Sequence, residues 1–520
     1  MGNPARASRR GAPGRSIESL LRAAIENHGD RPALVLAERA VTYDELDGAV
    51  VRLSERLAGL AGELAGNRIA VIAPNVPALV VGMFAAWRHG AVAVPLSARL
   101  REYELTGILA NAAPTAIITV SSYRGYSFVE LLRRVASQPP GFRGALVVDE
   151  LGDVTEELRG EIDDVPGEPL DAEIGALLYT SGTTGRPKGA LVQHAREAGA
   201  AEALRDVLEL THEDSCAQVI PIAHAFGLNC MLAAFSAGAR VILADSSVSV
   251  RPLLTAVRTH EATILHGSPA LFISVLKAAP DGLPTVRRGF VGGAGSPPGL
   301  LERLDGAGMR ILNLYGMTEI AAAACCRADD PPAVRYTTAG RPLPGFEWRV
   351  EPSAATGDIG GELCVRGPWV TPGYFRRPEE TAEAFVEGWF RTGDLGELDE
   401  QGHVRITGRL KDVVHIAGFS VFPAEVEGFL LTHPDVAQAA VVGAPHEQVG
   451  EVLQAFVVAR AGADVTPTSL LQFARNKIAD YKLPYGIRVV SELPLLASGK
   501  PDRVALRALV AERPEAAAPS

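Results

Sequence analysis

Cysteine is scarce in this chain of 520 residues, which contains 5 cysteines and no C-x-x-C pair. Such an odd and scattered set argues against a disulfide framework and against a zinc site. The composition favours buried, reduced thiols, which are typical of proteins in a reducing compartment. We therefore expect a cytoplasmic protein.

Long hydrophobic runs are also absent. The longest apolar stretch, Val76–Trp87, lies between Asn75 and Arg88 and is too short to span a bilayer, so we expect no integral membrane association. The chain has 61 acidic and 50 basic residues, and its net charge of −11 disfavours nucleic acid as a partner. The first residues lack the apolar segment of a secretory signal. Residues 1–16 and 512–520 are predicted to be disordered tails.

Lysine is rare as well. The chain has 6 lysines, which leaves 44 arginines among its 50 basic residues. Lys188, Lys411 and Lys500 lie in the motifs described below, and Lys482 lies in the segment Tyr481–Pro484, which precedes the last of them. A compact, rotatable ammonium group is suited to such places.

The most informative segment is Tyr179–Gly189, which reads YTSGTTGRPKG. Its glycines allow the backbone to approach a ligand closely, and successive N–H groups in such a loop bind anions. Pro187 and Gly189 flank Lys188, whereas in the common P-loop the lysine follows a glycine and precedes Ser or Thr. A polyphosphate site is favoured over an ordinary flexible surface loop. The candidate phosphate-binding residues are Thr180, Ser181, Gly182, Thr183, Thr184, Gly185 and Lys188.

Short apolar runs alternate with helix-like segments through the first two-thirds of the chain. This alternation predicts parallel sheets covered by helices. The predicted strands are Arg68–Ala73, Ala91–Leu96, Thr115–Val120, Gly144–Val148, Ile174–Tyr179, Ala239–Leu243, Thr263–His266, Gly289–Val291 and Arg310–Leu314. The glycine-rich loop follows one of them, and ligand sites of parallel sheets lie at the carboxyl ends of strands.

The pattern of predicted strands and helices changes twice after this region. Proline and glycine punctuate shorter strands from about Asp330, and helix and strand patterns mix again after Arg409. We therefore predict an α/β fold with a large N-terminal domain, residues 17–408, and a smaller mobile α+β domain, residues 409–511. The large domain is expected to divide into α/β subdomains at 17–170 and 171–330 and a β-rich, barrel-like subdomain at 331–408.

The loop Tyr179–Gly189 resembles the phosphate loop of the adenylate-forming enzymes, which include acyl-CoA synthetases, the adenylation domains of peptide synthetases and firefly luciferase. Further resemblances follow in order from about Arg88 to Arg503. The resemblance implies that ATP and Mg²⁺ activate a carboxylic acid as an acyl adenylate. It also implies that coenzyme A then accepts the acyl group.

The resemblance implies that two further motifs bind the nucleotide. GFVGGAGSP, Gly289–Pro297, is similar to the turn that lies along adenine, and NLYGMTE, Asn313–Glu319, is similar to the family's second nucleotide motif. The implied nucleotide-binding residues are Gly292, Gly293, Ala294, Asn313, Tyr315 (stacking on adenine), Gly316, Met317, Thr318 (donating to the α-phosphate), Asp394 and Arg409 (both on the ribose). The resemblance assigns Mg²⁺ to Glu319 together with Thr180.

The segment PIAHAFGL, Pro221–Leu228, resembles the family's acyl-site loop, in which a His gates the carboxylate pocket. This assigns the gate to His224. Relatives that activate α-amino acids typically have Asp at the next position, where this chain has Ala225, so an α-amino acid is disfavoured. Small and apolar residues suggest a fatty or aromatic acyl group, and the expected pocket is Ala225, Phe226, His266, Gly267 and Val291.

Motifs in the C-terminal part of the chain resemble the mobile elements of the family. Lys411 matches the hinge, Gly418 the face that serves thioester formation, and Lys500 the essential catalytic lysine. His415 stands where many relatives have Lys, which either alters the second half-reaction or is tolerated. The segment GELCVRG and the following PGYF are assigned to the scaffold.

The favoured hypothesis is that the protein is an AMP-forming acyl-CoA synthetase, an acid–thiol ligase. The alternative keeps the adenylation step and transfers the acyl group to the phosphopantetheine of a separate acyl carrier protein, since no carrier-like segment is seen after Arg503. A catalytically inactive nucleotide-binding module is disfavoured because all the expected reactive residues are present. The absence of G-x-S-x-G and H-E-x-x-H argues against a hydrolase and a zincin. The acid and the oligomeric state are not readable from the sequence.

Overall fold

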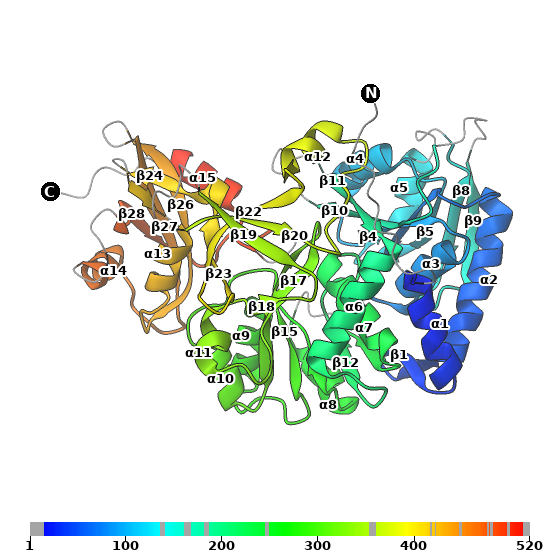
Figure 1. The fold of residues 1–520 in the computed structure, drawn as a ribbon, viewed down its shortest axis with the longest axis horizontal. Helices are drawn as coiled ribbons and strands as arrows, with labels where there is room; N and C mark the ends of the chain where they lie inside the picture. Colours follow the sequence, from blue (N-terminus) through cyan, green and yellow to red (C-terminus); the bar gives the residue numbers. More distant parts are fainter. Residues whose placement is uncertain are drawn as a thin grey trace.

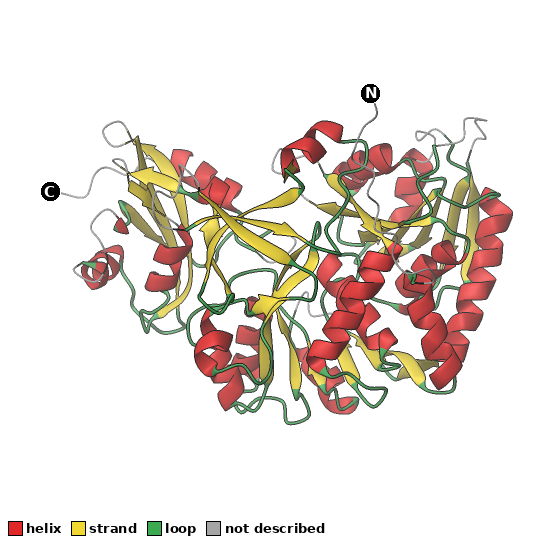
Figure 2. Cartoon of the chain, viewed as in Figure 1, coloured by secondary structure: helices red, strands yellow, loops and turns green. Residues whose placement is uncertain are grey.

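The computed structural model describes residues 15–135, 141–160, 168–180, 187–244, 249–352, 360–416, 419–421, 423–446, 450–475, 478, 482–496 and 500–512. Within these ranges the strands form two large sheets, two smaller sheets and a short ribbon, β6 (Ser122–Tyr123) with β7 (Tyr126–Ser127). Most of the predicted tails, 1–16 and 512–520, lies outside the described residues. Figure 1 shows the elements along the chain, and Figure 2 their distribution between helix and strand.

The first large sheet has seven strands and a parallel centre. In spatial order they are β11 (Lys188–Gln193), β10 (Ile174–Thr180), β4 (Val92–Ser97), β3 (Arg68–Ala73), β5 (Ala116–Val120), β8 (Gly144–Val148) and β9 (Val154–Arg159). Strands β10 through β8 pair in parallel, whereas β11 and β9 are antiparallel edges. The central strands are almost completely buried, which explains why they read as continuous apolar runs. The connecting helices are α2 (Tyr43–Ala61), α3 (Pro77–Arg88), α4 (Glu102–Ala112) and α5 (Phe128–Val135).

The second large sheet has nine strands and brings together distant parts of the chain. Its order is β18 (Arg341–Pro342), β17 (Ala321–Cys325), β16 (Arg310–Met317), β15 (Arg288–Val291), β14 (Ile264–Leu265), β12 (Ser215–Gln218), β13 (Arg240–Leu243), β1 (Pro32–Leu36) and β2 (Arg39–Thr42). Its helices are α1 (Ile17–His28), α6 (His194–Leu208), α7 (Ala225–Ser236), α8 (Arg251–Thr259), α9 (Pro269–Ala278), α10 (Leu300–Gly306) and α11 (Pro332–Thr337). Helix α6 contacts strands of both large sheets, so it belongs to the layer between them.

A third, five-stranded sheet follows. It contains β19 (Glu347–Pro352), β20 (Gly361–Arg366), β22 (Trp389–Leu398), β21 (Phe385–Val386) and β23 (Val404–Arg409), with helix α12 (Pro378–Ala384) beside it. All of its pairings are antiparallel. In Figure 1 this sheet lies between the large sheets and the C-terminal part.

The C-terminal part forms a separate α/β body, drawn in orange and red in Figure 1. It begins after the single turn η1 (Leu410–Asp412). Its strands are β25 (Phe419–Val421), β24 (Val414–Ile416), β27 (Gly450–Ala459), β26 (Val436–His446) and β28 (Gly486–Val489), and its helices are α13 (Pro423–Leu430), α14 (Pro467–Ala474) and α15 (Arg503–Glu512).

The predicted fold class is confirmed: parallel-sheet α/β layers, a smaller antiparallel sheet and a smaller C-terminal domain. The subdomain ranges 17–170 and 171–330 do not coincide with the sheets. Strands β1 and β2 join the nine-stranded sheet, and β10 and β11 join the seven-stranded one. Among the described helices, none has both the length and the apolarity needed to cross a membrane. The five cysteines are free and buried.

Candidate active site

A single cavity of about 4050 Å³ lies where the two large sheets, the third sheet and the C-terminal domain meet. The ends of strands β10, β15 and β16 supply part of its wall, as parallel strands do at their carboxyl ends. The third sheet adds β22 and β23, and the C-terminal domain adds the segment that carries Lys500. Residues far apart in the sequence therefore face one space.

The phosphate-loop ends are fixed by the sheet. Thr180, the last residue of β10, is the antiparallel partner of Lys188, the first residue of β11, and both line the cavity. Lys188 Nζ lies 5.3 Å from the ring centroid of Tyr374. Five predicted phosphate-binding residues lie outside the described residues: Ser181, Gly182, Thr183, Thr184 and Gly185.

Glu319 is a buried carboxylate in the cavity wall, with 8% of its surface exposed. The hydroxyl of Tyr374 donates to Glu319 Oε1 over 2.8 Å. Burial raises the pKa of Glu319, while the Tyr374 hydrogen bond and the charges of Arg409 and Lys188 oppose this shift. The carboxylate is therefore costly to keep ionised unless a cation is near it.

Tyr374 was not among the predicted site residues, because its motif PGYF was assigned to the scaffold. Backbone hydrogen bonds place it beside β11: Phe375 N–H donates to Gly189 O (2.8 Å), and Leu191 N–H donates to Gly373 O (3.0 Å). Its hydroxyl then reaches Glu319, and its ring lies under Lys188. The sequence signal was an aromatic hydroxyl next to a glycine, which is too common to identify a site.

At the predicted nucleoside side of the cavity, one carboxylate links side chains of three strands. Asp394 on β22 is 5% exposed and accepts from the Tyr315 hydroxyl at 2.6 Å. Arg409 on β23 pairs with the other carboxylate oxygen at 2.9 Å. Burial and the Asp394 charge hold the pKa of Tyr315 well above its usual value, so the phenol keeps its proton and donates. Each Asp394 oxygen retains acceptor capacity for a further donor.

The glycine-containing turns define the rest of this side. Gly293 has φ +82°, a conformation that favours glycine. A Cβ on Gly316 would lie 1.9 Å from Ala321 O, so only glycine fits there. Asn313 Nδ2 donates to Arg335 O (3.1 Å) and Thr338 O (2.9 Å). The predicted nucleotide-binding residues of this region all line the cavity: Gly292, Gly293, Ala294, Asn313, Tyr315, Gly316, Met317 and Thr318.

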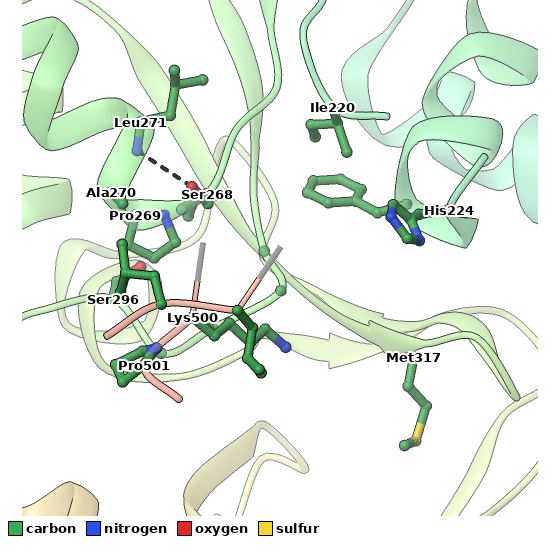
Figure 3. A pocket seen from close by; sticks show the side chains of 18 of the residues that line it. Ile220, His224, Ser268, Pro269, Ala270, Leu271, Ser296, Met317, Lys500 and Pro501 are labelled. Atoms are coloured by element: carbon green, nitrogen blue, oxygen red, sulfur yellow. Dashed lines mark hydrogen bonds between the residues drawn. The ribbon is translucent and has the colours of Figure 1, made fainter. Parts of the chain in front are cut away.

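His224 occupies the N-cap position of α7, without a side-chain capping hydrogen bond, and lines the cavity, as Figure 3 shows. Desolvation, followed by the charges of Arg99 and Lys500, lowers the pKa of His224 below 6.5. The imidazole is therefore neutral at pH 7. Lys500 lines the same cavity as His224.

Three of the five residues predicted for the acyl pocket line the cavity: Ala225, Phe226 and Val291. The other two, His266 and Gly267, do not contribute to its wall. His266 is 1% exposed, accepts a hydrogen bond from Phe290 N–H at Nδ1 (3.2 Å) and stacks on the Phe290 ring. Burial lowers the pKa of His266 to about 3, so it is a neutral core residue. The part of these two residues in acyl binding stays a prediction.

Lys500 lines the same cavity as Thr180, Lys188 and Glu319. Figure 3 shows it on its C-terminal segment in the pocket that also holds His224. The backbone there is held by Leu496 N–H, which donates to Lys500 O over 2.8 Å. Lys411 lies in η1 and His415 on β24, and their side chains are not described. Gly418 lies outside the described residues.

Comparison with known proteins decides the family. The model of the AMP-binding enzyme family matches residues 21–375, and that of the AMP-binding enzyme C-terminal domain matches residues 425–500. The chain belongs to the AMP-binding enzyme family. The predicted family and reaction class, an AMP-forming acid–thiol ligase, are thereby confirmed.

Curated relatives of this AMP-binding enzyme align over nearly their whole length. It is 32% identical to a 3-[(3aS,4S,7aS)-7a-methyl-1,5-dioxo-octahydro-1H-inden-4-yl]propanoyl:CoA ligase of Rhodococcus jostii, over 94% of this chain and 98% of that protein. It is also 32% identical to a feruloyl-CoA synthase of an Amycolatopsis species, over 89% of this chain and 92% of that protein.

Solved structures share the fold across both domains of the AMP-binding enzyme. One is o-succinylbenzoate CoA synthetase from Bacillus subtilis in complex with its acyl-adenylate intermediate (TM-score 0.80, 28% identity, 94% of this chain and 97% of that chain). Another is ATP-bound MatB from Rhodopseudomonas palustris (TM-score 0.81, 28% identity, 95% of this chain and 99% of that chain).

Proposed function

We propose that this enzyme uses ATP to convert a carboxylic acid into an acyl adenylate and then into an acyl-CoA. The observation that carries the proposal is the meeting of two lysines from different domains in one cavity. Lys188 enters from the seven-stranded sheet and Lys500 from the C-terminal domain. Both reactants of the first step are anions, so positive charge on two sides of the site lowers their repulsion.

In the first step a carboxylate oxygen of the acid attacks the α-phosphorus of ATP, and the bond to the pyrophosphate oxygen breaks. Lys188 and the backbone of its loop hold the departing pyrophosphate. Lys500 donates to the carboxylate and the α-phosphate oxygens as charge develops between them. Thr318 donates to the α-phosphate. His224, neutral at pH 7, closes the carboxylate pocket without adding charge.

Asp394 and Arg409 hold the ribose, and Tyr315 stacks on the adenine. Because Tyr315 already donates to Asp394, its ring position is fixed before ATP arrives. Gly292, Gly293 and Ala294 allow the base to approach the backbone. The Tyr315 side chain therefore loses little rotational freedom when the nucleotide binds.

Magnesium fits this arrangement through the nucleotide. Among the described residues, no group of three or more His, Cys, Asp or Glu side chains could hold a metal by itself. Mg²⁺ is commonly bound by one or two carboxylates together with substrate phosphates, and Glu319 with Thr180 offers that donor set. When bound, the ion would supply charge neutralisation at the phosphates.

In the second step the sulfur of CoA attacks the acyl carbon, the bond to AMP breaks, and the thiol proton leaves to solvent. We assign Lys411 to the hinge that exchanges Lys500 for the Gly418 face, with His415 near that face. The relatives named as CoA ligases support CoA as acceptor. Incubating the enzyme with CoA or with a pantetheinylated carrier protein distinguishes this acceptor from the carrier alternative.

The test is acid-dependent pyrophosphate release across acids of varied chain length and ring content, with acyl-CoA identified by mass spectrometry. Lys500→Ala is expected to lower adenylate formation about 10²–10³-fold or more, as the loss of one preorganised donor does. The same variant is expected to retain thioester formation from supplied acyl-AMP. Equal loss of both steps would contradict the exchange of faces. No pyrophosphate release with any acid would contradict the proposed activity.

A further inference from the structure

The loop that carries His224 is held by a side chain from the other large sheet. This loop, residues 219–224, connects β12 to α7 and belongs to the nine-stranded sheet. Asn75 follows β3 of the seven-stranded sheet. Its Nδ2 donates to Ile220 O over 2.9 Å, and Ile222 N–H donates to its Oδ1 over 3.0 Å. One amide therefore joins backbone groups that lie 145 and 147 residues further along the chain.

These two hydrogen bonds fix the orientation of the Asn75 amide. A reversed amide would set its oxygen against the Ile220 carbonyl oxygen and its NH₂ group against the Ile222 N–H. Gln218 supports the same carbonyl, since its Nε2 donates to Ile220 O over 2.7 Å. Ile222 is fully buried, so its N–H depends on Asn75 for a partner. A buried donor left without a partner costs about 1–3 kcal/mol.

The support given by Asn75 reaches His224 through one tight turn. His224 N–H donates to Pro221 O over 3.0 Å, and α7 begins at the next residue. A Cβ on Gly227 would lie 2.2 Å from Pro221 O, so this turn packs directly on the first turn of α7. Figure 3 shows Ile220 and His224 on the same side of the pocket. The backbone on both sides of the turn is therefore fixed, and with it the point from which the imidazole enters the cavity.

Asn75 does not serve its own helix. Asparagine near the start of a helix is usually the N-cap, where its side chain accepts from a backbone N–H of the first turn. The N-cap of α3 is Val76, which makes no side-chain capping hydrogen bond. Asn75 is half-buried and lines the cavity, as Ile220 and His224 do. Its amide supports the wall that holds His224.

We propose that Asn75 is a positioning residue that holds the imidazole of His224 at the carboxylate of the acid. It acts through its hydrogen bonds with Ile220 and Ile222. The placement of a gate residue of the nine-stranded sheet thus depends on a contact with the seven-stranded sheet. This assignment rests on the role of His224 in the function proposed above.

NMR of the histidine rings tests the placement without any substrate. The Cε1 positions of the 11 histidines are labelled with ¹³C, and the signal of His224 is the one that His224→Ala removes. Asn75→Ala is expected to shift or broaden this signal and to leave that of the buried His266 in place. Asn67→Ala is the matched control, because Asn67 Nδ2 donates to Glu63 O over 2.9 Å and Asn67 does not line the cavity. An unchanged His224 signal in Asn75→Ala, or an equal change in Asn67→Ala, would overturn the proposal.

Kinetics with the acid that releases most pyrophosphate then separate positioning from folding. Asn75→Ala is expected to lower kcat/KM for the acid about 10-fold, the equivalent of one hydrogen bond, and to leave KM for ATP within twofold. In the His224→Ala background the same change should lower kcat/KM for the acid less than twofold, because the group through which Asn75 acts is gone. Fully additive losses would refute the proposal, as would equal rises in KM for acid and ATP.

Asn75→Asp repeats these measurements if the alanine variant does not fold. The carboxylate keeps the size of the side chain and the acceptor for Ile222 N–H, but it cannot donate to Ile220 O. A His224 signal identical to that of the wild type in this variant would count against the proposal. The NMR measurement needs no turnover, so failure of the proposed activity and failure of this assignment are distinguishable.

Discussion

At the scale of single residues, Tyr374 connects the two charged groups expected at the pyrophosphate. Its ring lies under Lys188, and its hydroxyl donates to Glu319. A hydrogen bond donated to a carboxylate favours its ionised form, so the Tyr374 hydroxyl opposes the rise that burial causes in the pKa of Glu319. Tyr374→Phe is therefore expected to raise the pKa of Glu319 further. The kcat/KM for ATP should fall about 10-fold or more, in line with ~1.5–3 kcal/mol for a hydrogen bond to a charged group. The acid limb of its pH profile should move to higher pH.

Tyr43→Phe is the matched control for this change. Its hydroxyl donates to Ala239 O over 2.7 Å in the core, away from the cavity wall. The control should lower the thermal stability and leave the pH profile in place. If the two variants shift the acid limb equally, Tyr374 does not act through Glu319.

Glu197 gives the fold a measurable pH dependence. Burial of this side chain on α6 raises its folded pKa to about 8, above the reference value of 4.5. Between these values the folded state holds a proton that the unfolded state has lost, so stability falls as pH rises, by at most about 1.4 kcal/mol per pH unit for this group. Glu197→Gln removes this dependence. The Tm of the Gln variant minus that of the wild type should increase from pH 5 to pH 8 in scanning calorimetry. A constant difference would show that Glu197 ionises normally.

At the scale of elements, the turn η1 joins the third sheet to the C-terminal domain. Asp412 at its end pairs with Arg503 (3.6 Å) and Arg507 (3.4 Å) of α15, so the turn is attached to the body that it would carry. Proline at position 411 fixes φ and removes an N–H group. Lys411→Pro is expected to slow thioester formation from acyl-AMP at least about 10-fold and to spare adenylation, because a hinge must change its backbone angles. Rapid-quench measurement of both half-reactions, with Lys411→Ala as control, decides this. Unchanged thioester formation in the proline variant would count against a hinge at this turn.

The elements also show what a sequence can and cannot reveal. Most central strands of both large sheets were predicted, because burial on two faces makes them continuous apolar runs. Strand β12 (Ser215–Gln218) was not predicted, because its sequence SCAQ is not such a run. His266 was predicted to line the acyl pocket and is buried in the core, since β14 has only two residues and a strand that short does not reveal whether the residue after it faces the cavity or the core. Tyr374 was missed because its position depends on backbone bonds to β11, which lies about 180 residues earlier in the chain.

At the scale of the whole molecule, four bodies meet at one cavity, so nucleotide binding should stabilise all of them together. A ligand that binds only the folded state adds about 2.7 kcal/mol at a concentration 100-fold above its Kd. We expect ATP with Mg²⁺ to raise Tm, and tripolyphosphate with Mg²⁺ to raise it less, because Asp394 and Tyr315 are then unused. Differential scanning fluorimetry measures both shifts. Equal shifts would mean that the nucleoside side of the cavity contributes nothing.

The order of the motifs allowed the large-scale plan of the site to be predicted, including Lys188 from the first motif and Lys500 from the last, which line one cavity. The assignment of segments to sheets was less predictable. The run Pro32–Leu36 pairs with β13, about 200 residues later, and such long-range pairing leaves no local signal. The ranges of the domains and the roles of the site residues remain predictions that the experiments above test.

The pairing of β1 with the distant strand β13 has a practical consequence. Strand β13 hydrogen-bonds to β1 on one flank and β12 on the other. A polypeptide trimmed to begin after Thr42 would keep every nucleotide motif. The edge of β13 that pairs with β1 would then have no partner strand. Exposed flanks of this kind recruit other chains, so such a trimmed form should precipitate rather than merely lose activity.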